Sequence, residues 1–237
     1  MKRLRVLMTR QEIVPERLAG ATVVVLDVFM ATTTLLEILE NGASDVYPAE
    51  NLEEAEGLRA KLGPDVLRGG EQDAARIDGY DHGPFPEEYA PGVVRERDVI
   101  FVTTNGTRAI ADAAGAGRVL LGCLRNAPAV ARELEESGTD SVYLVCAGSA
   151  GRFTVEDFLG AATIISRMDP SGWRLNDAAW LATDFARRHE GNVHGVLRES
   201  RAGRWFVDND RMDAFAFVAD VGASGLVPEV VGGRAIV

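Results

Sequence analysis

The stretch from Thr22 to Glu40 reads TVVVLDVFMATTTLLEILE, and it predicts the fold class of the chain. Its first half is an apolar run that ends at Asp27, which is typical of a strand covered on both faces of a sheet. Its second half starts with threonines, continues with apolar side chains three and four residues apart, and stops at Asn41-Gly42. This pattern predicts a helix over 32–40. The stretch is therefore a strand, a short turn and a helix, with an acidic residue where the strand ends.

The same alternation continues outward in both directions, which indicates an α/β protein. We predict strands over 5–8, 22–27, 45–48, 98–103, 118–122 and 141–146, and a late strand near 214–218. We predict helices over 32–40, 52–62, 106–114, 128–137, 154–168, 176–190 and 193–200, and a closing segment over 200–207. Residues 69–92 are dense in Gly, Pro and acidic residues and predict a long loop. The expected fold is a three-layer α/β/α domain over 1–237 with a mostly parallel or mixed sheet, and 170–210 is a candidate helical lobe.

Composition excludes several classes of function. The chain has 36 acidic and 25 basic residues and a net charge of −11, so it would repel nucleic acids and anionic membranes. Two cysteines cannot form a disulfide framework or a four-thiolate zinc site, and three histidines limit imidazole-based metal chemistry. No secretory signal is readable, and no window approaches the roughly 20 apolar residues of a membrane helix. We therefore expect a cytoplasmic protein.

Three turns share one arrangement, in which an apolar strand ends in small or hydroxyl residues and a helix begins at once. They are VVVLDVFMATTT over 23–34, VIFVTTNGT over 99–107 and VYLVCAGSAGRFTVED over 142–157. Ligands of open α/β sheets bind at strand ends, and helix starts present unpaired N–H groups to anions. The turns therefore predict a pocket for a phosphate or sulfonate group. Ordinary helix capping is the alternative interpretation of each turn.

Acidic residues near these turns suggest a metal site. Asp27 is costly at the end of an apolar strand unless it meets a cation or hydrogen-bond donors. Oxygen ligands suit Mg²⁺, which commonly takes one or two carboxylates and bridges to a substrate phosphate. The candidate metal ligands are Asp27, Glu71, Glu156 and Asp157, and the candidate catalytic residues are Asp27, Glu71, Asp81 and His82. Glu156 and Asp157 could instead complement the helix dipole, with Thr154 as the N-cap.

Small, hydroxyl and basic residues in the turns are candidates for binding the substrate. They are Thr32, Thr33, Thr104, Asn105, Gly106, Thr107, Arg125, Cys146, Gly148 and Arg152. Guanidinium groups grip phosphate or sulfonate bidentately, although Arg108, Arg125 and Arg152 could equally be surface residues. Cys146 permits a nucleophile, and a buried structural cysteine is its alternative. His82 could protonate a leaving alkoxide.

These segments resemble the 2-phosphosulfolactate phosphatase family. The resemblance spans nearly the whole chain, through LDVFMATTTLLEILENGA (26–43), GGE (69–71), GYDHGPFPEEY (79–89), TTNGT (103–107), CAGSAGRFTVEDFLGAA (146–162) and the late segment from 200 through 213 to 228. It implies a three-layer α/β fold. It also implies Mg²⁺-dependent hydrolysis of 2-phosphosulfolactate to sulfolactate and phosphate, a step in coenzyme M biosynthesis.

Two positions depart from the family pattern. Met30 stands where an arginine is expected, which removes a cation that could hold phosphate or sulfonate, and Gly83-Pro84-Phe85-Pro86 follows His82 where a G-N-S-P-like stretch is usual. Three hypotheses remain open: the phosphatase of 2-phosphosulfolactate, a phosphatase of a carboxylated analogue such as phospholactate or phosphoglycerate, and a non-catalytic protein that binds an organophosphate or sulfonate. Attack by water and a covalent route through Asp27 or Cys146 are both open. A homodimer is reasonable.

Overall fold

A single mixed sheet runs through the protein, whose computed structural model covers residues 1–237. Its strands are β1 (Lys2–Leu7), β2 (Thr22–Leu26), β3 (Val46–Ala49), β4 (Leu67–Gln72), β5 (Ala75–Arg76), β6 (Val99–Val102), β7 (Arg118–Gly122), β8 (Ser141–Cys146), β9 (Trp173–Leu175), β10 (Glu229–Val231) and β11 (Arg234–Ile236). They lie in the order β5-β4-β6-β3-β11-β10-β7-β2-β8-β1-β9. The central strand β2 is buried along its whole length, as its apolar sequence predicts.

Two parallel blocks of strands are joined by an antiparallel hairpin. Parallel pairs connect β4, β6 and β3 on one side and β7, β2, β8, β1 and β9 on the other. The carboxy-terminal hairpin β10–β11 lies between the blocks, where β10 pairs with β7 and β11 with β3, both antiparallel. Because parallel strands of one block point the same way, the turns after β2, β7 and β8 meet at one edge of the sheet.

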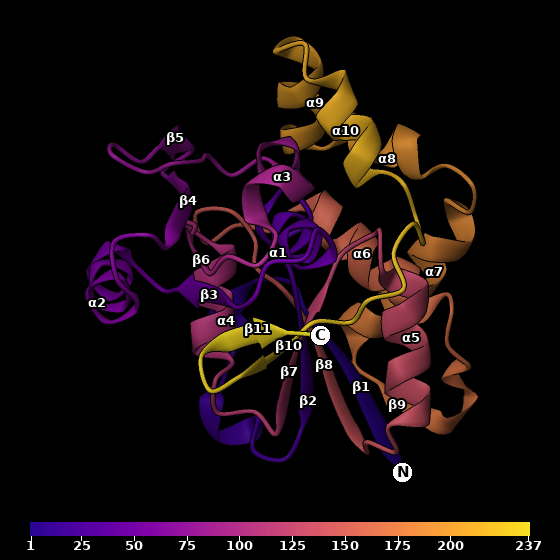
Figure 1. Cartoon of the computed structure of the whole chain (residues 1–237). Coiled ribbons are helices and arrows are strands. Elements are labelled where there is room, and N and C mark those ends of the chain that lie inside the picture. Colours follow the sequence, from indigo (N-terminus) through magenta and orange to yellow (C-terminus); the bar gives the residue numbers. More distant parts are fainter.

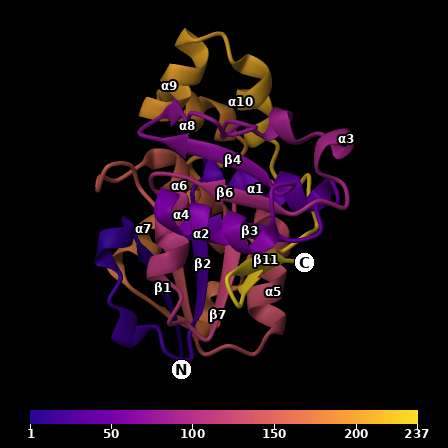
Figure 2. The same cartoon turned by 60° about the vertical axis from the view of Figure 1, so that its left-hand side comes forward.

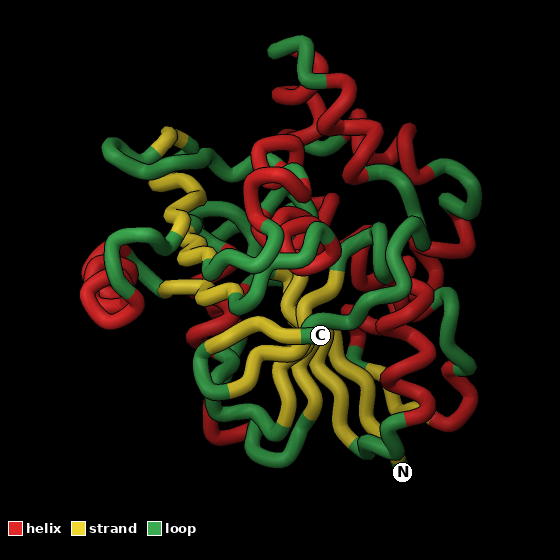
Figure 3. The backbone as a smooth tube through the Cα atoms, viewed as in Figure 1, coloured by secondary structure: helices red, strands yellow, loops and turns green.

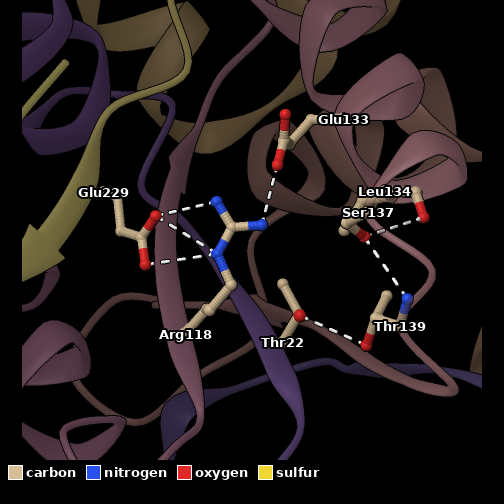
Figure 4. Close-up of polar contacts among 7 residues, drawn as sticks. All are labelled: Thr22, Arg118, Glu133, Leu134, Ser137, Thr139 and Glu229. Atoms are coloured by element: carbon tan, nitrogen blue, oxygen red, sulfur yellow. Dashed lines mark hydrogen bonds and ion pairs between the residues drawn. The ribbon is translucent and has the colours of Figure 1, made fainter.

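Charged contacts fasten this hairpin to the central block (Figure 4). The guanidinium of Arg118 on β7 lies 2.7 Å from Glu229 on β10 and 2.7 Å from Glu133 of a neighbouring helix. Thr22 on β2 donates a hydrogen bond of 3.2 Å to Thr139 in the loop before β8. The Arg118 contacts tie the hairpin to β7 and the neighbouring helix, and the Thr22 contact ties β2 to the loop before β8.

Helices cover both faces of the sheet (Figure 1 and Figure 3). The α-helices are α1 (Ala31–Glu40), α2 (Leu52–Leu62), α3 (Pro91–Val94), α4 (Gly106–Asp112), α5 (Ala127–Glu136), α6 (Val155–Ile165), α7 (Asp177–Arg188), α8 (Val193–Glu199), α9 (Arg201–Asp208) and α10 (Met212–Val218). Short 3₁₀ helices occupy Arg10–Glu12, Pro15–Arg17, Pro86–Tyr89 and Pro170–Gly172. No helix combines the length and the apolar character that a membrane crossing requires.

The alternation of side chains along β2 divides the core between these two layers. Val23 and Val25 pack with apolar residues of α1 and α4. Val24 and Leu26 point to the other face and pack with α5, α6 and α7. The predicted three-layer α/β/α class is therefore confirmed, and the sheet is mixed.

The helices α8, α9 and α10 form a helical lobe at the end of the molecule toward which the central strands point (Figure 1 and Figure 2). A separate apolar cluster joins this lobe to the rest of the protein. Helices occupy much of the candidate lobe 170–210 and continue through α10 to residue 218. The lobe stands over the sheet edge at which the turns after β2, β7 and β8 meet.

Two predicted elements are wrong. The late strand near 214–218 is the helix α10, whose buried residues Ala214, Phe215 and Val218 have helical spacing. The predicted loop over 69–92 contains most of β4, which pairs with β6 in parallel. Gly69 and Gly70 hide this strand in the sequence, because each is needed for a close approach: a Cβ at Gly70 would lie 1.8 Å from the Val102 carbonyl oxygen.

Candidate active site

Asp27 is the first residue after β2, and it begins a tightly hydrogen-bonded turn. The Ala31 N–H donates to Asp27 Oδ1 at 3.3 Å. The Thr32 hydroxyl accepts from the Asp27 N–H at 3.0 Å and donates to its carbonyl at 2.9 Å. The Thr33 hydroxyl donates to the Val28 carbonyl at 2.9 Å. Thr32 therefore holds the backbone of Asp27 and Thr33 holds that of Val28, and both hydroxyl groups are paired within the turn.

Asp157 joins this turn to the loop after β8. Its Oδ1 accepts a hydrogen bond from the Val28 N–H at 2.8 Å. Its Oδ2 accepts from the Gly148 N–H at 3.0 Å and from the Thr154 hydroxyl at 2.7 Å. Thr154 is the N-cap of α6 by position, but its hydroxyl donates to Asp157 and caps no backbone N–H. Asp157 is thus a brace between two neighbouring strand ends.

Glu71 braces the third turn in a similar way. Its carboxylate accepts from the Thr104 N–H at 2.6 Å, from the Thr104 hydroxyl at 2.9 Å and from the Ala74 N–H at 2.7 Å. Thr103 and Thr107 exchange hydrogen bonds between their hydroxyl and N–H groups. Glu71, which ends up beside the β6 turn through the pairing of β4 with β6, therefore orders this loop.

The three turns lie together at one edge of the sheet. The Asn105 side-chain oxygen accepts a hydrogen bond from the Ala150 N–H at 3.2 Å, which links the turns after β6 and β8. Gly106 approaches Asp27 so closely that a Cβ there would lie 2.6 Å from Asp27 Oδ2. Gly148 adopts a φ of +70°, which suits glycine, and donates to Asp157. The structure therefore brings Asp27, Asn105 and Gly148 together, as a pocket formed by the three turns requires.

Four carboxylates share this edge without a paired cation. Asp27, Glu156 and Asp157 are buried, and no ion pair includes any of these three or Glu71. Burial, together with the charges of Glu71 and Glu156, raises the pKa of Asp27 to about 7. Burial and the charges of Asp27 and Glu156 raise the pKa of Asp157 well above its usual range. The cluster therefore stores electrostatic repulsion that a bound cation would relieve.

The carboxylates differ in how many hydrogen bonds they accept from the protein. Asp157 and Glu71 each accept three. Asp27 Oδ2 accepts none. Burial raises the pKa of Glu156, and its own backbone N–H, the Ser200 side chain and the charge of Arg201 oppose this rise. No three Asp, Glu, His or Cys side chains lie close enough to form a metal cage by themselves. A cation here would thus take one or two protein carboxylates and complete its shell with other oxygens.

Three predicted residues, Asp81, His82 and Arg152, form no hydrogen bond or ion pair with the carboxylates. Asp81 is exposed, and its carboxylate accepts from the Arg68 N–H at 2.9 Å. The His82 ring lies 5.3 Å from that of Tyr89. Arg152 is exposed and has no ion-pair partner. The structure does not bring these three side chains into contact with the carboxylates, and their roles stay predictions.

Arg125 and Cys146 are directed into the protein. The Arg125 guanidinium lies 3.7 Å from the centre of the Phe217 ring and donates to the Phe217 carbonyl at 3.1 Å. Cys146 is fully buried in the core between the sheet and α6. Burial raises the pKa of its thiol well above the usual range. These contacts replace the substrate contacts predicted for both residues and leave Cys146 unsuited to be a nucleophile.

The sequence also missed residues that border the site. Ser200 and Arg201 stand at the start of α9 in the helical lobe, and both lower the pKa of Glu156. A cavity of about 280 Å³ beside Glu71 is lined by Glu50, Asn51, Leu52, Glu53, Glu71, Gln72, Val102, Thr103, Thr104 and Arg108. A serine before a helix is an ordinary cap, so nothing in the local sequence distinguished Ser200.

Buried carboxylates among helix starts at a strand edge define an α/β enzyme that acts on a small anionic molecule. Comparisons with known proteins make this class specific. The family model for 2-phosphosulpholactate phosphatase matches residues 7–233. A protein of Symbiobacterium thermophilum named "Probable 2-phosphosulfolactate phosphatase" is 39% identical over 225 residues, which cover 93% of this chain and 96% of that protein.

Two further relatives carry the same name. The protein of Caldanaerobacter subterraneus subsp. tengcongensis is 33% identical, with 89% of this chain and 88% of the relative covered. The protein of Clostridium acetobutylicum is 30% identical, with 98% and 99% covered. The chain belongs to the 2-phosphosulpholactate phosphatase family, and it is a phosphatase that hydrolyses a phosphate monoester.

Proposed function

We propose that the protein hydrolyses 2-phosphosulfolactate to sulfolactate and phosphate with the help of Mg²⁺. The observation that carries this proposal is the group of buried carboxylates around Asp27, none of which forms an ion pair. The shared name of the relatives supports the substrate. An anionic ester would be repelled by this cluster unless a positive charge lay between them.

The residues present fit Mg²⁺. Mg²⁺ prefers oxygen ligands, keeps several waters and often binds through one or two carboxylates together with substrate phosphate. Asp27, through its Oδ2, and Glu156 would hold it, since Asp157 and Glu71 are occupied as braces. Bound there, Mg²⁺ supplies positive charge that stabilises the phosphoryl oxygens.

Backbone N–H groups are the donors best placed for the phosphate. The helices α1 and α6 begin at the turns that hold Asp27 and Asp157, and their N-cap residues, Met30 and Thr154, cap no backbone N–H with a side chain. In α1 the Ala31 N–H donates to Asp27. By contrast, α2 and α7 are capped by Asn51 and Asn176. Uncapped helix starts leave N–H groups that can bind anionic oxygens. This assignment replaces the threonine hydroxyls, which are used inside the turns.

We assign the attack on phosphorus to water. The Cys146 thiol is fully buried and has a raised pKa, which argues against a covalent route through it. The carboxylate cluster would orient the water in line with the departing alkoxide, and His82 stays the predicted proton donor. Trapping of a phosphoenzyme in a rapid-quench experiment would contradict the water route.

Phosphate release tests the proposed function. Purified protein should release phosphate from 2-phosphosulfolactate when Mg²⁺ is present and stop when EDTA is added, because the acidic cluster then repels the ester. Turnover that persists in EDTA would contradict the role of the metal. Tight binding of the ester without turnover would favour the rival hypothesis of a non-catalytic binding protein.

The substitution Met30→Arg tests the interpretation of this position. Met30 packs in the apolar cluster beneath the lobe, and an arginine could lay its stem there and extend its guanidinium toward the substrate. A new charged contact to an anion should lower KM about 10-fold or more. Steady-state assays with 2-phosphosulfolactate, phospholactate and phosphoglycerate measure the change. An unaltered KM and preference would show that Met30 has no bearing on the substrate.

Location and assembly remain predictions. The cytoplasmic location, the place in coenzyme M biosynthesis, the homodimer and the absence of a nucleic-acid partner rest on the sequence and on the family resemblance.

A further inference from the structure

The sheet has two places at which neighbouring parallel strands send their following helices to opposite faces. The first lies at the carboxylate cluster, where β2 leads to α1 on one face and its neighbour β8 leads to α6 on the other. Ligands of open α/β sheets bind at such switch points, outside the carboxyl ends of the strands. The position of the candidate active site follows this rule.

The second switch point lies between β3 and β6, which pair in parallel. The helix that follows β3 is α2, whose Ala55 belongs to the same apolar cluster as Ile100 and Val102 of β6. The helix that follows β6 is α4, whose Ala109 packs with Phe101, on the opposite face of β6. The same rule therefore points to a second ligand site at the carboxyl ends of β3 and β6.

The cavity of about 280 Å³ beside Glu71 lies at this second switch point, on the side of the molecule that Figure 2 brings forward. Glu50 is the first residue after β3, Thr103 is the first after β6, and Glu71 lies near the end of β4. Leu52 and Val102 are the two hydrophobic residues among the ten that line the cavity. Since pockets for drug-sized ligands span roughly 300–1,000 Å³, this cavity suits a small and polar molecule.

The start of α4 stands between this cavity and Asp27. Gly106 faces Asp27, because a Cβ there would lie 2.6 Å from Asp27 Oδ2. Arg108 comes two residues later and lines the cavity. Side chains two residues apart on a helix point in nearly opposite directions, since the helix turns about 100° per residue. The cavity is therefore separate from the site at which the ester is held.

Arg108 is a half-buried cation that forms no ion pair, although carboxylates line the same cavity. Glu71 is occupied by its hydrogen bonds to the β6 turn. Glu50 and Glu53 are exposed at the rim and also form no ion pair. Opposite charges thus line one cavity without meeting each other.

We propose that this cavity binds a small zwitterion, an amino acid, whose carboxylate contacts Arg108 and whose ammonium group contacts Glu50 and Glu53. A planar guanidinium binds a carboxylate bidentately, and an ammonium group donates to carboxylates. A ligand with only a negative charge is repelled by the glutamates, and one with only a positive charge is repelled by Arg108. The inference goes beyond the phosphatase activity and does not depend on it.

Calorimetric titration of the purified protein with each of the standard amino acids tests the ligand class. The tightest binder is then compared with the two molecules that lack one of its charges. For L-serine these are 3-hydroxypropionate, which lacks the amino group, and ethanolamine, which lacks the carboxylate. Each should bind at least about 10-fold more weakly than the amino acid. Equal binding of either one, or no binding of any amino acid at about 10 mM, would overturn the proposal.

Substitutions locate the ligand in the cavity. Arg108→Ala should weaken amino-acid binding roughly 10- to 100-fold, and Arg108→Lys should recover part of the affinity because it keeps the charge. Arg108→Gln keeps most of the apolar stem and should lose as much affinity as Arg108→Ala, which separates the loss of charge from misfolding. The double variant Glu50→Gln, Glu53→Gln should also bind more weakly. Unchanged binding in Arg108→Gln would overturn the proposal.

Matched controls lie on α5, where Arg132 and Glu136 are exposed and form no ion pair. Arg132→Ala and Glu136→Gln should bind the amino acid as the wild type does, and an equal loss in either would overturn the proposal.

Two further titrations separate the cavity from the candidate active site. Asp27→Asn, and the wild type saturated with inorganic phosphate, should each bind the amino acid within about threefold of the free wild type. A loss in Asp27→Asn, or competition with phosphate, would place the ligand at the carboxylate cluster and overturn the inference. Because these titrations require no turnover, their outcome is independent of whether the protein hydrolyses 2-phosphosulfolactate.

Discussion

Asp27→Asn should lower kcat for phosphate-ester hydrolysis about 100- to 1,000-fold and at the same time raise the free energy of unfolding at pH 8. The loss of activity follows because the amide keeps the shape of the carboxylate but removes the charge that would hold the cation. The gain in stability follows because Asp27 is buried among other acids without a paired base.

The gain in the free energy of unfolding should increase as the pH rises. Burial and the charges of Glu71 and Glu156 raise the pKa of Asp27 from 3.8 to about 7, so the folded protein binds the proton more tightly than the unfolded chain. Stability from this group is fully present below pH 3.8 and is lost as the pH rises through about 7. The substitution should therefore gain up to about 4 kcal/mol at pH 8 and little near pH 4.

Urea unfolding of metal-free protein at pH 4 and pH 8, followed by circular dichroism, measures this difference. Asp78→Asn is the matched control, because Asp78 is exposed and forms no ion pair. Mg²⁺ should raise the melting temperature of the wild type at pH 8 more than that of Asp27→Asn. An Asp27→Asn protein that is less stable than the wild type at pH 8 would contradict the raised pKa of Asp27. One that keeps full activity would contradict the carboxylate cluster as the active site.

Gly106→Ala should disable the site through backbone geometry alone. A methyl group at residue 106 would lie 2.4 Å from the Cβ of Ala31 and 2.6 Å from Asp27 Oδ2, both well inside contact distance. The start of α4 must then move away from the Asp27 turn. We expect a loss of about 1–3 kcal/mol in the free energy of unfolding. Because a displacement of about 1 Å can cost 100-fold in rate, kcat should fall by about that factor.

Gly57→Ala provides the control for this substitution. Gly57 lies in the interior of α2, is exposed, and has nothing within 4 Å of an added Cβ. Alanine there should raise the free energy of unfolding by about 0.5–1 kcal/mol and leave activity unchanged. Thermal melting of both variants measures the change in stability, and phosphate release measures the change in kcat. A Gly106→Ala protein with wild-type kcat would show that the close approach of α4 to Asp27 is not needed for catalysis.

The local sequence predicted secondary structure well where the spacing of apolar side chains distinguishes a helix from a strand. The helix over 52–62 coincides with α2, and the strands over 118–122 and 141–146 coincide with β7 and β8. These segments have clear periodicity and stop signals, so their structure depends little on distant contacts. The predicted strand over 214–218 failed because an apolar run with two phenylalanines fits either element, and contact with Phe29 favours the helix.

The sequence by itself determined the alternation of strands and helices, the acidic residue at the end of β2 and the three small-residue turns, because these are properties of neighbouring residues. Only the tertiary structure decided the roles within the site. It made Asp157 and Glu71 braces, turned Arg125 and Cys146 inward, and stacked Phe206 of the lobe on Phe29 beside Asp27. The physical reason is that hydrogen-bond partners and burial depend on which distant segments meet, and that information is not contained in the spacing of residues along the chain.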